Sequence, residues 1–261
     1  MAEIGGLALE PVRESGWRSG LSPLMRAGFG EWWGTRQWLL QAALWTLVIN
    51  GSLAAVVWGE APEDTDAFTL YSVMTMFAAI AVAILMQEAV VGEKRSGTAA
   101  WVMSKPASRD AFMLSKLVPN AVGVIATMVA VPSAFVLVQV LLAGIDVSVP
   151  RFALGTLVIA LNLMFYLTLT LMLGCLFDSA GPVIAIPLAF AFGQQLIAGV
   201  PGLASVLPWA LVVAADESET SVAGAIITGQ PVPAPGAIIA TAVACVAFTV
   251  VAFWKWRRTE L

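Results

Sequence analysis

Six long apolar runs without a single Asp, Glu, Lys or Arg limit this chain to a small set of folds. They are Trp38–Val57, Phe68–Met86, Leu117–Leu142, Phe152–Phe177, Pro182–Val200 and Gly236–Trp254. A helix needs about 20 apolar residues to cross the hydrocarbon core of a bilayer. Since 59% of the residues are hydrophobic and only 11% are charged, we expect an all-α polytopic membrane protein with six transmembrane helices.

The distribution of Lys and Arg predicts the orientation of these helices. With six spans, both termini and the segment between the second and third runs share one side of the membrane. That side receives every Lys and Arg except Arg151. Basic residues favour the cytoplasmic side, so the chain is predicted to lie in the plasma (inner) membrane with both termini in the cytoplasm.

A charge-dense segment, Gln87–Lys116, separates the second and third apolar runs; we call it the insert. Gly97 allows a turn, and Thr98 is a good N-cap for a short helix over Ala99–Met103. Pro106 disfavours helical geometry at the residue before it, which ends that helix. Ser108 is predicted to cap the next helix. The pattern indicates a short helix held between two turns outside the membrane.

The order Glu93, Gly97-Thr98, Ser104-x-Pro106, Ser108-Arg109 and Lys116 resembles the cytosolic loop of ABC-2 type transporter permeases. In that family the loop carries a coupling helix that docks on a separate ATPase subunit. The resemblance therefore implies an ATPase-coupling role for Glu93, Gly97, Thr98, Trp101, Ser104, Pro106, Ser108, Arg109 and Lys116. We expect Trp101 to fill a groove on the ATPase, and Glu93 to pair most plausibly with Arg109.

Two further helices are predicted beside the spans. Met25, Phe29, Trp32 and Trp33 share one face of a helix over Pro23–Gln37, which reads as an interfacial elbow helix with tryptophans at headgroup level. Leu203–Ala215 is too short to span. We expect it to form a short external helix that ends at Asp216-Glu217, followed by a loop over Ser218–Pro235. Residues 1–22 form a cytosolic segment, and residues 23–261 form one permease domain.

The sequence also limits the chemistry of the chain. It contains no G-x-x-x-x-G-K-[ST] motif that would bind ATP phosphates, so ATP and Mg are expected in the partner ATPase, with no cofactor or metal in this chain. The absence of histidine removes Ser-His and Cys-His catalytic pairs. Cys175 and Cys245 lie in apolar runs and read as small buried hydrophobes. Nothing indicates nucleic-acid binding.

The resemblance implies the permease subunit of an exporter, not an enzyme. Its partners would be an ABC ATPase, membrane lipid and a second permease subunit, in a homodimer or a paralogous heterodimer. The lack of charge inside the spans favours a lipophilic or amphipathic substrate, but a drug, a lipid, a peptide and a glycan all stay open. A non-transporting membrane module, such as an immunity or assembly factor, and an intramembrane enzyme are the alternatives.

Polar residues within the spans are candidates for a substrate path. The alternative is that they form hydrogen bonds between helices. They are Asn50, Gln139, Asn162, Tyr166, Gln194 and Gln195.

Overall fold

The computed structural model describes residues 15–58, 64–197, 200, 202–214 and 220–259, and this part of the chain is helical with no strand. A short 3-10 turn, Gly16–Arg18, precedes the first helices. The α-helices are α1 (Leu21–Trp33), α2 (Gln37–Val57), α3 (Asp64–Gln87), α4 (Glu93–Ser96), α5 (Thr98–Met103), α6 (Arg109–Val124), α7 (Val131–Leu142), α8 (Val149–Leu176), α9 (Ala180–Ile197), α10 (Val222–Thr228) and α11 (Pro235–Arg257).

Two π-helical stretches join neighbouring α-helices into long continuous runs. Glu88–Gly92 links α3 to α4, and Ile125–Ala130 links α6 to α7. The resulting runs, Ala67–Ser96 and Arg109–Leu142, are 30 and 34 residues long. Pro132 has no backbone N–H to donate and lies directly after the second stretch, where the hydrogen-bonding pattern is already altered. These runs exceed the thickness of a bilayer, so each extends beyond the membrane at one end or tilts within it.

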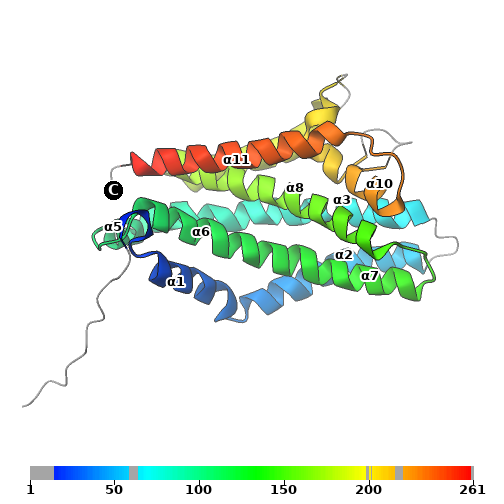
Figure 1. Ribbon diagram of the computed structural model, residues 1–261, viewed down its shortest axis with the longest axis horizontal. Helices are drawn as coiled ribbons and strands as arrows, with labels where there is room; N and C mark the ends of the chain where they lie inside the picture. The colour runs from blue at the N-terminus through cyan, green and yellow to red at the C-terminus, as the bar shows by residue number, and fades with distance from the viewer. Residues whose placement is uncertain (1–14, 59–63, 198–199, 201, 215–219, 260–261) are drawn as a thin grey trace, which may run out of the picture.

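Within the described residues, five helices are long and apolar enough to cross a membrane, namely α2, the α3–α4 run, the α6–α7 run, α8 and α11. They match five of the six predicted runs. The remaining run forms α9, whose apolar part, Ala180–Gln194, is shorter. The elongated bundle that they build is shown in Figure 1. The insert and the carboxyl end of α11 lie at one end of it, which we call the insert end; α10 lies at the opposite end.

The long helix α8 forms the centre of the bundle, and most of its side chains are buried against α3, α11, α9 and α10. Tyr71 of α3 stacks on Phe152 of α8, with ring centroids 5.8 Å apart. The Tyr71 hydroxyl also makes a 2.6 Å hydrogen bond with Ser133 of α7. Tight packing and interhelical hydrogen bonds of this kind hold helices together in lipid, where burial of apolar surface supplies little driving force.

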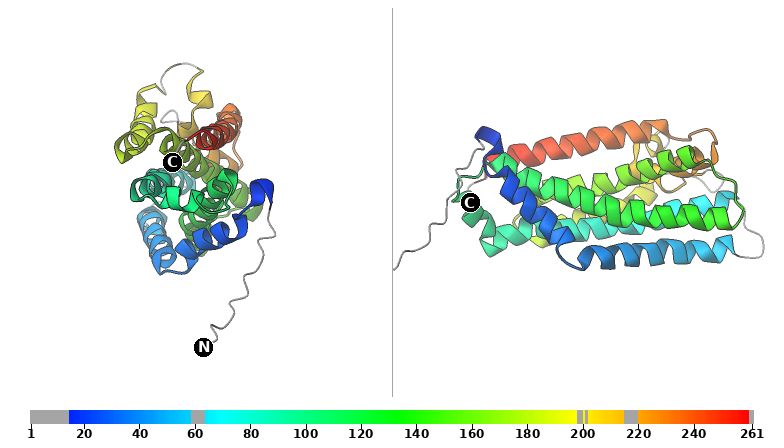
Figure 2. Two further views of the ribbon diagram at one scale, coloured as in Figure 1. Left: turned by 90° about the vertical axis from the view of Figure 1, so that its left-hand side faces the viewer. Right: turned by 60° about the horizontal axis from the view of Figure 1, so that its bottom comes forward.

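Helix α1 agrees with the predicted elbow in position, but its contacts differ from the prediction. It crosses α6 at an angle before the chain turns into α2 (Figure 2). Trp32 was expected at headgroup level, which is wrong: its ring is buried on Gly123 of α6, and its Nε1 donates to Asn120 Oδ1 at 2.9 Å. Gly28 lies against Ser115 and Pro119 in the same way. Gly28 on α1 and Gly123 on α6 permit this close approach of the two helices.

The region between α9 and α11 also differs from the prediction. Leu203–Ala215 forms two short 3-10 turns, Ala204–Val206 and Pro208–Leu211, because Pro208 interrupts the run. The predicted helix end at Asp216-Glu217 lies outside the described residues. The predicted loop over Ser218–Pro235 is wrong in part, since it contains α10. Ser221 caps α10 by accepting from Gly224 N at 3.0 Å, and Gly229 ends it at a positive φ.

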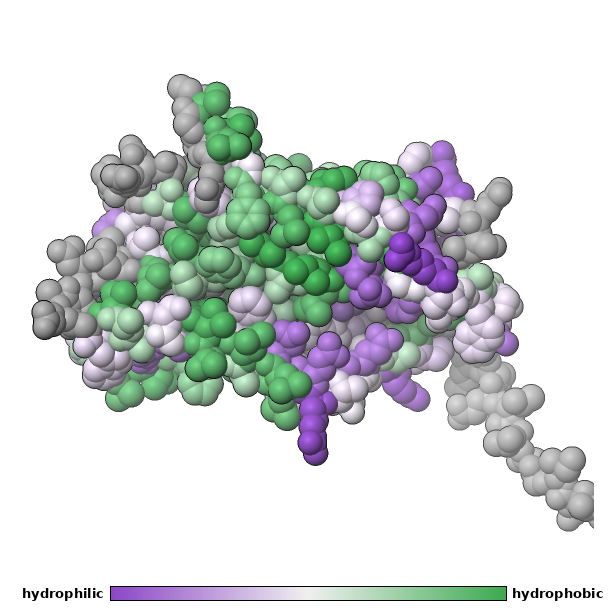
Figure 3. All heavy atoms as spheres, turned by 180° about the vertical axis from the view of Figure 1, so that it is seen from behind, coloured by the Kyte–Doolittle hydropathy of each residue, from purple (hydrophilic) through white to green (hydrophobic). Residues whose placement is uncertain are grey.

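Apolar side chains cover much of the outer surface of the bundle. Figure 3 shows a hydrophobic area over the middle of one face, while hydrophilic residues gather towards the insert end. Large exposed side chains include Leu40, Leu47, Leu157, Ile239 and Val246. Such a continuous apolar surface is unfavourable in water and favourable in lipid, which agrees with a multi-pass membrane protein.

Candidate functional site at the insert end

The insert comprises the end of the α3–α4 run, the short helix α5, a turn and the first two turns of α6. Gly97 takes a φ of 75° between α4 and α5, a backbone conformation that favours glycine. Thr98 was predicted to cap α5, which is wrong: Gly97 occupies the N-cap position. The Thr98 hydroxyl forms a 2.8 Å hydrogen bond with Ser96 Oγ. Helix α5 ends at Met103, within the predicted limits. Ser108 caps α6 as predicted by accepting from Ala111 N at 3.0 Å.

Trp101 projects from α5 and is 64% exposed. The Lys105 ammonium lies 5.0 Å from its ring centroid. Ser104 and Pro106 form the turn after α5, where Ser104 Oγ donates to the Trp101 carbonyl at 2.7 Å. The turn therefore presents an aromatic ring with a neighbouring positive charge on the outside of the molecule. Tryptophan is enriched at protein interfaces relative to the rest of the surface.

The residues before α1, Ser15–Gly20, form a strap across this turn. The Ser108 backbone N–H donates to the Ser19 carbonyl at 2.8 Å, and Ser19 Oγ donates to the Pro106 carbonyl. Gly20 has a φ of 73° and lies against Ala107, so a Cβ there would come within 2.9 Å of the Ala107 methyl. The strap fixes the turn to α1. Sequence reasoning missed this contact, because neither segment carries an apolar pattern.

Glu93 and Lys116 form an ion pair between the two arms of the insert. Only 20% of the Glu93 side chain and 9% of the Lys116 side chain are exposed, so both charges are shielded from water. The predicted pair between Glu93 and Arg109 is therefore wrong. Arg109 lies at the start of α6, and Lys116, two turns later, is the residue that reaches Glu93.

Arg109 instead contacts the carboxyl end of α11. Its Nη1 lies 3.0, 2.8 and 2.6 Å from the carbonyl oxygens of Trp256, Arg257 and Thr259. Carbonyls at the carboxyl end of a helix carry the negative end of its dipole, so a guanidinium is well suited to them. The Trp256 carbonyl also accepts from the Thr259 backbone N–H at 3.2 Å. Arg109 thus acts within this chain, on α11. It was expected to contribute to ATPase coupling and to pair with Glu93, not to contact α11.

Two neighbours of Arg109 strengthen this contact. Asp110 accepts two 2.7 Å hydrogen bonds from Arg257, in the paired geometry that arginine and carboxylate favour. One turn further along α6, Phe112 stacks on Trp256, and each residue is 1% exposed. We call these six residues the latch: Arg109, Asp110, Phe112, Trp256, Arg257 and Thr259.

Lys94 makes a similar contact with the carboxyl end of α8. Its Nζ lies 3.3 Å from the Cys175 carbonyl, 3.4 Å from the Phe177 carbonyl and 3.0 Å from Asp178 Oδ1. The Lys94 side chain is 9% exposed, whereas that of Asp178 is 92% exposed. From the sequence, Lys94 was expected to meet acidic groups on the partner and not to contact α8. The signal that could have found it is Asp178, the single charge between the fourth and fifth apolar runs.

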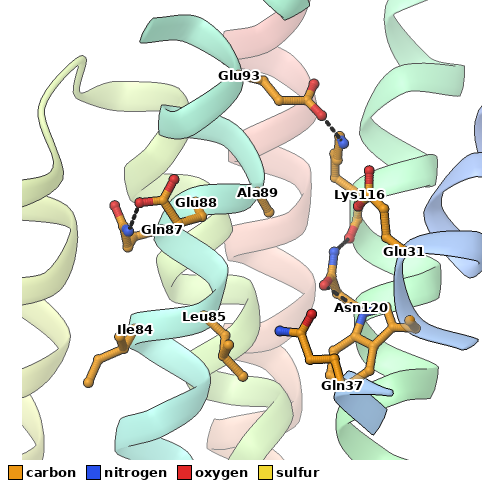
Figure 4. Close-up of a pocket in the computed structure, with 11 residues that line it drawn as sticks. Glu31, Gln37, Ile84, Leu85, Gln87, Glu88, Ala89, Glu93, Lys116 and Asn120 are labelled. Atoms are coloured by element: carbon orange, nitrogen blue, oxygen red, sulfur yellow. Dashed lines mark hydrogen bonds and ion pairs between the residues drawn. The ribbon is translucent and has the colours of Figure 1, made fainter. Parts of the chain in front are cut away.

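A hollow of about 490 Å³ lies beside the insert, between α3, α6 and the junction of α1 with α2. Figure 4 shows Glu93 reaching Lys116 across one end of it, with Asn120 and Glu31 along one side. Gln87 and Glu88 are joined by a 2.5 Å hydrogen bond on the other side. Ile84 and Leu85 supply an apolar part of the lining. The hollow therefore has polar and apolar walls at the edge of the bundle.

The residues proposed for a substrate path lie in separate places. Asn50 Nδ2 donates to the Pro132 carbonyl at 3.2 Å, and Gln139 Nε2 donates to the Asn50 carbonyl at 3.4 Å, between α2 and α7. Far from them, Gln194 donates to Tyr166 OH and accepts from Trp209 N, both at 3.0 Å.

These two groups of contacts match the alternative of hydrogen bonds between helices. Asn162 is buried in α8, with no hydrogen-bond partner for its Nδ2 among the residues that the structure describes. Gln195 lies in α9. A shared path through these residues stays a prediction.

A search of curated proteins finds no match to the chain. A protein-family model described as ABC-2 family transporter protein matches residues 37–261, which includes the insert and every helix from α2 to α11. Together with the membrane-spanning helices of the bundle, this match shows that the chain belongs to the ABC-2 family of transporter proteins.

Proposed function

We propose that the chain is the permease subunit of an ABC-2 exporter, driven by ATP hydrolysis in a separate ATPase subunit that docks on α5. The observation that carries this proposal is the insert itself. It holds a rigid short helix at one end of a bundle of apolar helices, with Trp101 exposed and its flanks fixed by hydrogen bonds and ion pairs. A rigid element connected to two long helices transmits movement from a docked partner into the membrane domain.

The proposal includes six spans, with α9 as the fifth. Helix α8 starts at Val149, and Gly155 near this start packs against α10. The same helix ends at Leu176 beside Lys94 of the insert. The chain therefore runs from the insert end to the α10 end between Leu176 and Val222, and α9 is the helix that covers this distance. Its 18 residues span about 27 Å, close to the thickness of the hydrocarbon core.

The insert end then faces the cytoplasm of a plasma (inner) membrane, because it carries the basic residues of the chain. A second permease subunit, identical or paralogous, would complete the transport unit, and the apolar helices would contact lipid. The substrate is proposed to be lipophilic or amphipathic. The hollow beside the insert supports this, since it offers polar and apolar walls together. ATP and Mg would bind to the ATPase.

Affinity purification tests the proposal. The tagged chain is purified from its own host, and ABC ATPase subunits are identified by mass spectrometry. We expect one to co-purify, and Trp101→Ala to reduce the amount retained. Trp254→Ala is the matched control, because Trp254 is 51% exposed on α11, outside the insert. If no ATPase co-purifies, or if Trp101→Ala and wild type retain equal amounts of it, α5 is not the docking site of an ATPase.

A further inference from the structure

The insert is attached to more helices than its position in the sequence implies. It continues directly into α3 on one side and α6 on the other. Arg109 also caps the carboxyl end of α11, and Lys94 caps the carboxyl end of α8. Among the described residues, no hydrogen bond or ion pair joins the insert to α2 or α9.

These attachments differ in strength. The Asp110–Arg257 pair contributes little by itself, because 61% of the Arg257 side chain is exposed and water screens the charges. The stack of Phe112 on Trp256 is buried and excludes water. Arg109 contacts three carbonyl oxygens at the same end of α11, including that of Trp256 itself. An apolar contact and a charged cap therefore hold the same turn of α11.

Resting on the proposed function, we infer that Arg109 and Lys94 are positioning residues that make the insert, α8 and α11 move as one body when the ATPase moves the insert. Helices α8 and α11 also pack against each other along much of their length. A displacement of the insert would therefore reach the α10 end of the bundle through α11. Helices α2 and α9 would be the elements past which this body shifts.

The first test replaces the latch with a covalent link. Asp110→Cys and Arg257→Cys are introduced with Cys175→Ala and Cys245→Ala, and the two thiols are joined by a bifunctional methanethiosulfonate; a monofunctional reagent is the control. The complex with its co-purified ATPase is placed in lipid nanodiscs. Amide hydrogen exchange of α10 and of Pro235–Thr241 is measured with and without ATP and vanadate.

We expect the linked complex to show the same nucleotide-dependent change in exchange at the α10 end as the control, since elements that move together tolerate a link. Loss of that change in the linked complex would overturn the inference, because it would mean that α11 must separate from the insert. A wild-type complex that shows no nucleotide response anywhere would instead count against the proposed function.

The second test weakens the latch. In Arg109→Gln/Asp110→Asn, the nucleotide-dependent change in amide hydrogen exchange at Pro235–Thr241 should be smaller by about threefold or more. This is the scale on which substitutions in connecting networks change the coupling between sites. The change within α5 itself should persist, which a merely unfolded variant would not show. A full-sized response at Pro235–Thr241 in this variant, with α5 also responding, would refute the role of Arg109 while leaving the ATPase assignment intact.

Discussion

Phe112 and Trp256 stack nearly face to face at the insert end, with ring centroids 4.8 Å apart and planes 6° apart. One residue belongs to the first turn of α6 and the other to the last turn of α11. Both are 1% exposed, so the pair closes the bundle against water at the level where the charged residues begin. The carboxyl end of α11 is thereby fixed to the insert.

Loss of this ring contact should destabilise the protein. Trp256→Ala removes a large buried side chain, which costs about 3–5 kcal/mol in protein cores, and we expect a clearly lower midpoint of thermal unfolding in detergent. Trp254→Ala should change the midpoint little, because Trp254 is 51% exposed. Equal midpoints for Trp256→Ala and wild type would show that the stack does not support the fold.

The shielded ion pair of Glu93 with Lys116 gives a second prediction. Glu93→Gln or Lys116→Gln leaves one charge poorly solvated, at a cost of about 1–3 kcal/mol. The double variant should lose less than the sum of the single losses, with a coupling energy of about 1 kcal/mol or more. Glu93→Gln combined with Arg109→Gln should be additive, because these two residues do not contact each other. Thermal unfolding of the wild type, the three single variants and the two double variants measures both cycles.

The sequence predicted local geometry at the insert better than it predicted partners. Gly97, Pro106 and Ser108 shape the backbone within a few residues, so the short helix and the cap of α6 follow from their chemistry alone. The partners of Glu93 and Arg109 depend on where α11 ends relative to α6. No local pattern contains that information, since Arg109 binds backbone carbonyls that every helix possesses.

The same limit explains the error at Trp32. An indole in a segment before an apolar run is expected at the membrane surface. Its burial depends on Gly123, which lies in another helix and offers no side chain. Similarly, Pro208 shows why an apolar run of about 13 residues need not become one helix. Ser221 and Gly229 are typical of the start and the end of a helix and could have predicted α10. The small residues around them made the segment resemble a loop.

The contact of Trp32 with Gly123 gives a third prediction. In Gly123→Ala the new methyl group would overlap the Trp32 ring, so α1 must shift at a cost of about 1–3 kcal/mol. Faster amide exchange in α1 measures the shift. Gly51→Ala in α2 is the control, because nothing lies within 4 Å of the added carbon, and it should be neutral or stabilise by about 0.5–1 kcal/mol.

A companion variant separates this overlap from a general effect on α6. In Trp32→Ala the ring is absent, so adding Gly123→Ala should then have little further effect on exchange in α1. If Gly123→Ala raises exchange equally in both backgrounds, the close approach of α1 to α6 does not determine the position of the elbow.

The topology gives the last prediction, because the number of spans fixes which side each end of the bundle faces. Single cysteines are placed at Ser96 in the insert, at Ser218 before α10 and at Thr259 after α11, with Cys175→Ala and Cys245→Ala as background. With six spans, an impermeant thiol reagent added to intact cells should label only Ser218→Cys. The other two should react only after lysis.

If α9 did not cross the membrane, Ser218 would face the cytoplasm and Thr259 the outside. The reagent would then label Thr259→Cys in intact cells, and Ser218→Cys only after lysis. The experiment thus distinguishes five spans from six, and labelling of Ser96→Cys from outside would reverse the orientation derived from the basic residues.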